Sequence, residues 1–205
     1  MDALAIHLAC FKLGAVSVPI ASLYGTEGLS YRLRDCGARM LVTDAVGAGK
    51  LTAMTEGVRP ATLEFVAVAD DTAPERGAFP LAELTSGGGD AIENTVSRAD
   101  DPAMLFYTSG TSGPAKGALH AHRVLIGHLP GFQMVFDLAP RPGDVFWTPS
   151  AWSWVASLVE VVLPALYFGH AIVASRERFS IAAAYRILSE HGVTCPFLAP
   201  AALRR

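Results

Sequence analysis

The sequence predicts an α/β fold in which parallel strands carry helices on their faces. Three observations predict it: short apolar runs recur along the chain, helix-forming stretches separate them, and glycines follow the ends of those stretches. Buried parallel strands are nearly continuous apolar runs, and a helix is the usual crossover between them. The expected strands cover residues 15–20, 40–43, 63–69, 103–106, 145–147, 171–174 and 193–198.

The helices are predicted from composition and from end signals. Residues 3–12 are helix-forming and run into Leu13-Gly14, a typical glycine stop. Thr26 is expected to cap a helix over 27–36 that ends at Gly37. The remaining helices are expected over residues 48–55, 121–135, 154–163 and 181–191.

The stretch from Tyr107 to Gly117 carries the clearest chemical signal. It reads Tyr-Thr-Ser-Gly-Thr-Ser-Gly-Pro-Ala-Lys-Gly and comes directly after the apolar strand candidate 103–106. Glycines let the backbone turn its N–H groups inward, hydroxyls add donors, and Lys116 adds a positive charge; such a loop suits phosphate oxygens. The expected ATP phosphate-binding residues are Thr108, Ser109, Gly110, Thr111, Ser112, Gly113 and Lys116.

Two other interpretations of this stretch compete with phosphate binding. Segments rich in glycine and serine commonly form solvated turns or linkers. The Walker phosphate loop is the nearer competitor, but it needs glycine directly before the lysine and Ser or Thr directly after it. Here those neighbours are Ala115 and Gly117, so the Walker motif is excluded. On composition alone, the phosphate site and the solvated turn both stay open.

With its flanks, the stretch resembles the phosphate loop of the adenylate-forming (AMP-binding) superfamily, which includes acyl-CoA synthetases. The family pattern is roughly Tyr-Thr-Ser-Gly-Thr-Thr/Ser-Gly-x-Pro-Lys-Gly, and this chain departs from it at Pro114-Ala115. Residues 118–123 are similar to the segment after the loop in acetyl- and medium-chain acyl-CoA synthetases. The segments 11–20, 31–39 and 145–169 resemble the same family, so the similarity covers nearly the whole chain.

The resemblance implies a part of the large N-terminal domain of that family, with flavodoxin-like parallel-sheet layers. We expect residues 1–85 to form a first α/β layer, incomplete at its N-terminus, and 86–101 to form a surface loop around Ser86-Gly87-Gly88-Gly89-Asp90. Residues 102–205 are then the phosphate-loop strand and a second α/β portion, truncated at its C-terminus. The later adenine, ribose and hinge motifs and the C-terminal catalytic lysine do not occur in this chain. The chain is therefore expected to be an inactive fragment.

Charge and cysteine usage exclude several classes of function. The formal charge is −3 and only 17% of residues are charged, which argues against nucleic acid as the main partner. Cys10, Cys36 and Cys195 offer neither zinc-ligand spacing nor a disulfide framework, so reduced thiols in a cytoplasmic protein are expected. Residues 146–175 contain Glu160 as their only fixed charge, but Pro164 and Gly169 interrupt them, which favours an interior helix over a membrane span.

A few further side chains have a candidate role beside a plain structural one. His120 and His122 alternate, yet two histidines without a third ligand are weak evidence for a metal, and none is predicted. Arg123 has two interpretations, steering phosphate or lying on a helix surface. Trp152 and Trp154 correspond to aromatic residues on the acyl or CoA side of the pocket in the resembling synthetases, and core packing is the alternative. That subfamily reads Asp-Trp-x-Trp-Ile-Gly-Gly here, whereas this chain has residues Ala151, Ala156 and Ser157 at the acid and glycine positions.

The resemblance thus implies an ATP-dependent acid–thiol ligase. A carboxylic acid would be activated as an acyl-adenylate and transferred to coenzyme A, with Mg²⁺ accompanying ATP and Lys116 as the catalytic residue of this chain. Two alternatives stay open: a non-catalytic remnant, and a nucleotide-binding module or kinase-like enzyme without ligase activity. The identity of the acid and the oligomeric state are not predicted.

Overall fold

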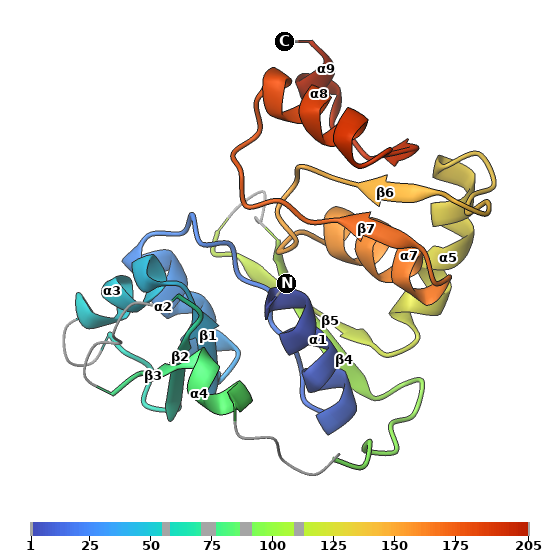
Figure 1. The fold of residues 1–205 in the computed structure, drawn as a ribbon. Coiled ribbons are helices and arrows are strands. Elements are labelled where there is room, and N and C mark those ends of the chain that lie inside the picture. The colour runs from blue at the N-terminus through green and yellow to red at the C-terminus, as the bar shows by residue number, and fades with distance from the viewer. Residues whose placement is uncertain (1, 55–57, 71–76, 87–91, 109–112, 205) are drawn as a thin grey trace.

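The computed structural model describes residues 2–54, 58–70, 77–86, 92–108 and 113–204. Three separate sheets are built from the described strands (Figure 1). The first and third sheets are parallel, as the sequence predicts, and helices pack beside them. The strands are β1 Met40–Thr43, β2 Phe65–Val68, β3 Phe79–Pro80, β4 Pro102–Thr108, β5 Lys116–Ala121, β6 Val145–Trp147, β7 Ala171–Val173 and β8 Cys195–Pro196.

The helices occupy the intervals between these strands. Asp44 caps α3 by accepting a hydrogen bond from the Gly47 amide at 2.8 Å, and Ser180 caps α8 through the Ala183 amide at 3.1 Å. The helices are α1 Asp2–Leu13, α2 Thr26–Asp35, α3 Ala45–Thr52, α4 Leu81–Ser86, α5 Val124–Val135, α6 Val155–Ser157, the π-helical turn η1 Leu158–Val162, α7 Leu163–Tyr167, α8 Ile181–Glu190 and α9 Pro200–Leu203.

The first sheet, in the order β1-β2-β3, packs against α2 through an apolar core. Leu33 is almost fully buried there and Leu29 lies one turn earlier, so α2 presents one apolar face to the sheet. The third sheet has the order β7-β6-β8 and is parallel throughout. Its middle strand contributes Phe146, which lies at the centre of an aromatic cluster with Phe132 and Phe136 of the α5 region.

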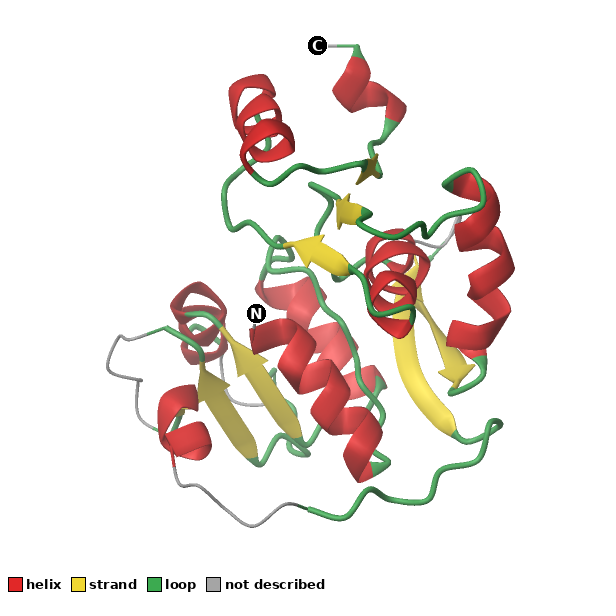
Figure 2. Cartoon of the chain, turned by 45° about the vertical axis from the view of Figure 1, so that its right-hand side comes forward, coloured by secondary structure: helices red, strands yellow, loops and turns green. Residues whose placement is uncertain are grey.

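Between these two sheets lies an antiparallel hairpin, β4–β5, which the sequence did not predict. Figures 1 and 2 both show α1 lying between the first sheet and this hairpin. Leu4 of α1, Met104 of β4 and Leu158 of η1 belong to one core cluster. The strand that would carry the candidate site is therefore buried between helices from two different parts of the chain.

The chain leaves and rejoins this central region at neighbouring points. Ser17 pairs with β4, because its N–H donates to Ala103 O and its carbonyl accepts from the Leu105 N–H, both at 2.9 Å. After the first sheet the chain returns, and the Thr95 N–H donates to Lys12 O at 2.8 Å. The expected strand over 15–20 is reduced to this single bridge at Ser17, so that prediction is wrong in extent.

Three further predictions are corrected by the structure. Thr26 is the first helical residue of α2, and Gly25 is the N-cap without any side-chain cap, so Thr26 is not the cap. The helix expected over 121–135 begins only at Val124, because the preceding residues extend β5. The helix expected to stop at Leu163 continues to Tyr167: Pro164 comes after the π-helical turn, at the start of α7, where a missing N–H is tolerated.

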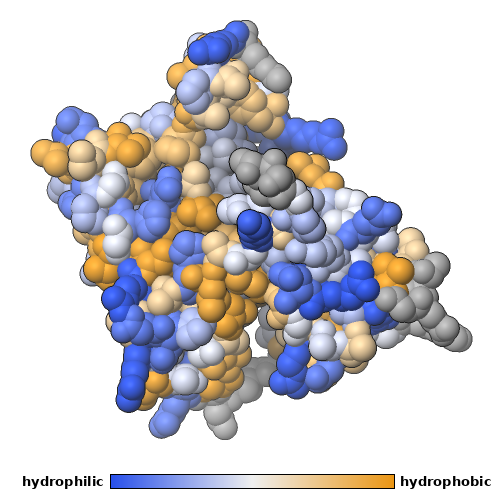
Figure 3. Space-filling view, turned by 180° about the vertical axis from the view of Figure 1, so that it is seen from behind, coloured by the Kyte–Doolittle hydropathy of each residue, from blue (hydrophilic) through white to orange (hydrophobic). Residues whose placement is uncertain are grey.

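The surface carries a substantial amount of exposed hydrophobic area. Figure 3 shows hydrophobic residues interspersed with polar ones on the face opposite to that of Figure 1. Among the described residues, the large exposed side chains include Leu119, Ile126, Met134, Leu138, Trp154, Tyr185 and Leu203. Scattered exposed apolar residues of this kind are common on folded proteins and by themselves indicate no partner.

Candidate functional site

The candidate site begins where the β4–β5 hairpin ends. Thr108 and Lys116 are directly opposite each other as the last pair of the ladder, and Tyr107 faces Gly117 one step earlier. Successive side chains alternate across a strand, so Thr108 and Lys116 lie on one face and Tyr107 on the other. Thr108 and Lys116 are both exposed. The hairpin therefore brings a hydroxyl and an ammonium group from the predicted motif to one edge.

The rest of the predicted phosphate loop is only partly described. Ser109, Gly110, Thr111 and Ser112 lie outside the described residues. Gly113 is described and has φ of +103°, a conformation that L side chains rarely adopt. A Cβ placed there would meet no atom within 4 Å, so the requirement for glycine is conformational and not steric.

Strand β4 and the residue directly before β5 are both hydrogen-bonded to α2. The Tyr107 hydroxyl lies 2.6 Å from Asp35 Oδ2 and 3.2 Å from the Arg32 carbonyl oxygen. On the other strand side, the Tyr31 hydroxyl donates to the Ala115 carbonyl oxygen at 2.8 Å. Sequence reasoning did not assign a role to these α2 residues. The only sequence signal for them was the resemblance of segment 31–39 to the family.

Arg32 is a buried cation beside the Tyr107 ring. Only 7% of the residue is exposed, and its guanidinium carbon lies 3.6 Å from the centre of the Tyr24 ring and 5.5 Å from that of Tyr107. One terminal nitrogen donates to Gly28 O at 2.8 Å, while Nε has no partner among the described residues. The aromatic faces offset part of the cost of burying this charge.

The Tyr107 hydroxyl remains a donor at all ordinary pH values. Burial, and after it the hydrogen bond to Asp35, raises the pKa of Tyr107 well above its usual value. The phenol therefore stays protonated, and the contact with the Asp35 carboxylate is a charge-assisted hydrogen bond.

The two tryptophans differ in their surroundings. Trp152 is half-buried and packs on the central core cluster, whereas Trp154 is 56% exposed and precedes α6 as its N-cap. Ser157, one of the departures from the family pattern, is fully buried, and its Oγ has no hydrogen-bond partner among the described residues. The assignment of Trp152 and Trp154 to the acyl or CoA side of the site stays a prediction.

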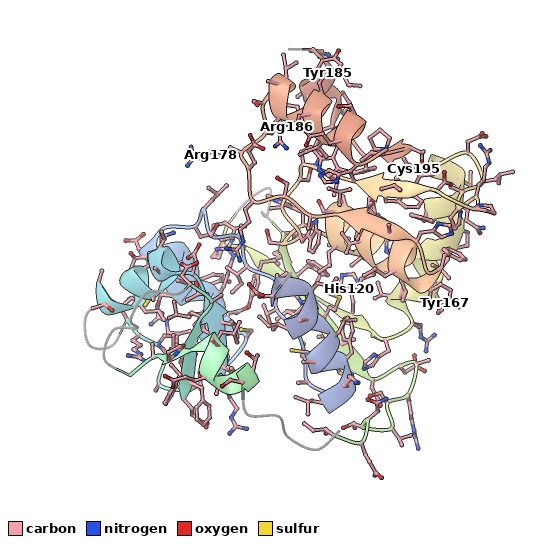
Figure 4. All side chains as sticks on the ribbon, viewed as in Figure 1. His120, Tyr167, Arg178, Tyr185, Arg186 and Cys195 are labelled. Atoms are coloured by element: carbon pink, nitrogen blue, oxygen red, sulfur yellow. The ribbon has the colours of Figure 1, made fainter. Side chains whose placement is uncertain are left out.

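The histidines and Arg123 have local packing or charge partners. His120, labelled in Figure 4, meets the Phe106 ring edge-on with centroids 5.7 Å apart, and His122 meets Phe11 in the same way at 5.8 Å. Arg123 precedes α5 and pairs with Asp100, both side chains being exposed. Among the described residues, no group of three or more His, Cys, Asp or Glu side chains could hold a metal ion.

The three cysteines are free and half-buried. Burial raises the pKa of each thiol, at Cys10, Cys36 and Cys195. A higher pKa lowers the thiolate fraction and hence the reactivity, so none of the three is suited to act as a nucleophile.

Two hollows on the described surface lie away from the hairpin end. The larger, about 190 Å³, lies on the first sheet beside Lys50, whose ammonium group donates to the Ser22 and Tyr24 carbonyl oxygens. The smaller, about 20 Å³, lies beside Thr148 and Arg178 near α8. Their lining residues do not include Thr108 or Lys116. Within the described ranges, no helix has the length and apolar character needed to cross a bilayer.

Comparison with solved structures shows where this fold occurs. The acyl-CoA synthetase of Brucella canis superposes on 99% of this chain and 36% of its own, with a TM-score of 0.85 at 24% identity. The inhibitor-bound N-terminal domain of FACL13 from Mycobacterium tuberculosis gives a TM-score of 0.85 over 98% of this chain and 48% of its own, also at 24% identity. Together these likenesses confirm the predicted fold class, a partial N-terminal domain of this type.

Comparison of sequences gives the family. The acetyl-coenzyme A synthetase 2 of Pseudomonas putida is 27% identical over 96% of this chain, and the acetyl-coenzyme A synthetase of Pasteurella multocida is 30% identical over 76%. The chain spans about a third of the length of the first and 26% of the second. The family model described as AMP-binding enzyme matches residues 1–205, and this chain therefore belongs to the AMP-binding enzyme family.

Proposed function

We propose that this chain contributes the phosphate-binding hairpin of an ATP-dependent acid–thiol ligase of the acyl-CoA synthetase type. The observation that carries the proposal is the pairing of Thr108 with Lys116 at the end of β4–β5, in a chain whose whole length matches the AMP-binding family. The substrates would be a carboxylic acid, ATP and coenzyme A. The relatives in sequence, which are acetyl-coenzyme A synthetases, support this substrate class.

In the proposed reaction, a carboxylate oxygen attacks the α-phosphorus of ATP, and pyrophosphate leaves. The thiol sulfur of coenzyme A then attacks the carbonyl carbon of the acyl-adenylate, and AMP leaves. Both steps can proceed without a covalent enzyme nucleophile, which agrees with the raised thiol pKa values of the cysteines.

The main obstacle to the first step is the repulsion between two anions. In the proposal, the Lys116 ammonium group neutralises charge on the phosphate chain, and the Thr108 hydroxyl donates a hydrogen bond to it. Ser109, Gly110, Thr111, Ser112 and Gly113 would supply further donors and close backbone approach. Mg²⁺ would enter as the counter-ion that ATP brings with it. Trp152 and Trp154 would lie on the acyl or CoA side.

The proposal is tested by titrating the chain with Mg·ATP in a calorimeter. Lys116→Ala should weaken binding about thirtyfold, since truncating one partner of a close charge pair costs ~2 kcal/mol or more. Lys12→Ala is the matched control, because Lys12 is an exposed lysine in the last turn of α1. Equal affinities of the wild type and Lys116→Ala would contradict a phosphate role for Lys116.

A second measurement separates a ligase from a nucleotide-binding module. Because this chain spans only about a third of the length of its relatives, the assay is done in a protein restored to their full length. Exchange of labelled pyrophosphate into ATP that depends on an added carboxylic acid then identifies acyl-adenylate formation. Binding of Mg·ATP without acid-dependent exchange, across acetate, medium-chain and aryl acids, would favour the module without ligase activity. That result would reject the ligase assignment for this chain.

A further inference from the structure

We propose that Tyr31 and Asp35 of α2 are positioning residues that hold Thr108 and Lys116 in register for phosphate binding. The inference rests on the proposed function and extends it to residues of the first α/β unit. Tyr31 and Asp35 are four residues apart and so share one face of the helix. Through that face, α2 contacts β4 and the residue directly before β5.

The two contacts act on opposite sides of the Thr108–Lys116 pair. Asp35 accepts from the Tyr107 hydroxyl at 2.6 Å, directly before Thr108 in β4. Tyr31 donates to the Ala115 carbonyl oxygen at 2.8 Å, directly before Lys116. Each of the two candidate phosphate ligands therefore comes directly after a residue tied to α2. A shift of either strand would change the separation between the hydroxyl and the ammonium group.

These contacts are additional to the packing that docks α2 itself. Leu29 and Leu33 already bury the apolar face of α2 against the first sheet. No described strand of the first sheet pairs with the hairpin, so the hydrogen bonds of Tyr31 and Asp35 are among the contacts that connect the hairpin to α2. Loss of one of these bonds is therefore expected to loosen the hairpin end without unfolding α2.

Arg32 and Gly117 lie close to the Tyr107 ring. The Arg32 guanidinium carbon lies 5.5 Å from the centre of the ring, and a Cβ on Gly117 would lie 3.5 Å from Tyr107 Cε1. The Tyr107 hydroxyl has two acceptors within reach, Asp35 Oδ2 at 2.6 Å and the Arg32 carbonyl oxygen at 3.2 Å, and the shorter contact is the one to Asp35.

The experiment uses hydroxyl deletions that keep the ring in place. Tyr31→Phe should weaken Mg·ATP binding about fivefold, the effect of losing one neutral hydrogen bond, and Tyr107→Phe should weaken it about tenfold or more, because its hydrogen bond to Asp35 is charge-assisted. Tyr185→Phe, an exposed tyrosine of α8 labelled in Figure 4, is the matched control and should leave the dissociation constant unchanged. Asp35→Ala should weaken binding similarly, and Asp35→Asn should restore most of it, because the amide oxygen still accepts from Tyr107.

The ligand series distinguishes positioning from general weakening of the fold. If the residues act by positioning, each variant should lose as much affinity for tripolyphosphate as for Mg·ATP. Its thermal unfolding transition should stay as steep as that of the wild type. Wild-type affinity in the Tyr31→Phe/Tyr107→Phe double variant, alongside weak binding in Lys116→Ala, would overturn the positioning inference and leave the proposed function standing. Equal affinity in wild type and Lys116→Ala would remove the proposed function, and the inference with it.

Discussion

The free energy of unfolding should depend on pH through His7, a residue of α1. The imidazole is buried, with only 8% of the residue exposed, and its Nδ1 lies 2.5 Å from the Oγ of Ser17, which is itself buried. Ser17 in turn pairs with β4, so this hydrogen bond connects α1 to the strand of the candidate site. Burial lowers the pKa of His7 to about 4, from the ordinary 6.5.

The sign of the effect depends on which state binds the proton. Between pH 6.5 and 4 the unfolded chain takes up a proton at His7 while the folded chain does not, so the free energy of unfolding falls as the pH is lowered. At about 1.4 kcal/mol per pH unit, the loss from His7 amounts to ~3 kcal/mol by pH 4. Above pH 6.5 the residue contributes no pH dependence.

Urea unfolding of the wild type and of His7→Asn, measured between pH 7.5 and 4, isolates this contribution. An asparagine amide can replace the hydrogen bond to Ser17 but does not titrate, so the difference between the two curves belongs to His7. The expected result is a flatter curve for His7→Asn below pH 6.5. Parallel curves for the two proteins would refute the burial argument.

Three further substitutions test the packing beside the third and the first sheet and a surface ion pair, by thermal or urea unfolding. Phe132→Ala should lower the free energy of unfolding by about 3–5 kcal/mol, because Phe132 is 2% exposed and contacts three other phenylalanine rings; a loss below about 1 kcal/mol would contradict a tight core. Gly47→Ala should cost about 1–3 kcal/mol, since its Cβ would overlap Thr43 Oγ1 and lie 3.1 Å from Thr43 Cβ; unchanged stability would show that Thr43 rearranges freely. Arg39→Ala should leave stability unchanged within error despite its ion pair with Glu64, because both side chains are solvated; a clear loss would show a burial that the structure lacks.

The parts of the fold that depend on apolar periodicity were predictable. Strands β1, β2, β6 and β7 lie on short apolar runs of the sequence, and their prediction as strands needs no knowledge of distant residues. Helix α8, Ile181–Glu190, lies where the sequence predicts a helix over 181–191. These are local signals, and the structure confirms them.

The parts that depend on long-range partners were not predictable from local pattern. Strand β5 contains glycine, alanine and a histidine, and it is a strand because β4 offers a paired edge. The π-helical turn before Pro164 arises from the register of the whole helix and has no local signature. At the site, the motif identified Thr108 and Lys116, but the partners of Tyr107 and Ala115 lie 72 and 84 residues away, beyond the reach of any spacing rule.

The return of the chain at Thr95 to the carbonyl of Lys12 has a consequence for how this protein can be altered. The segment that contains α2 to α4 begins and ends beside α1, so its two ends are close in space before β4 begins. The entropic cost of closing a loop grows only slowly with its length. Insertions or exchanges inside that segment should therefore leave the packing of α1 against β4 intact. Grafting the corresponding unit from a relative would then preserve the central strand, provided that the graft carries its own tyrosine and carboxylate toward the hairpin.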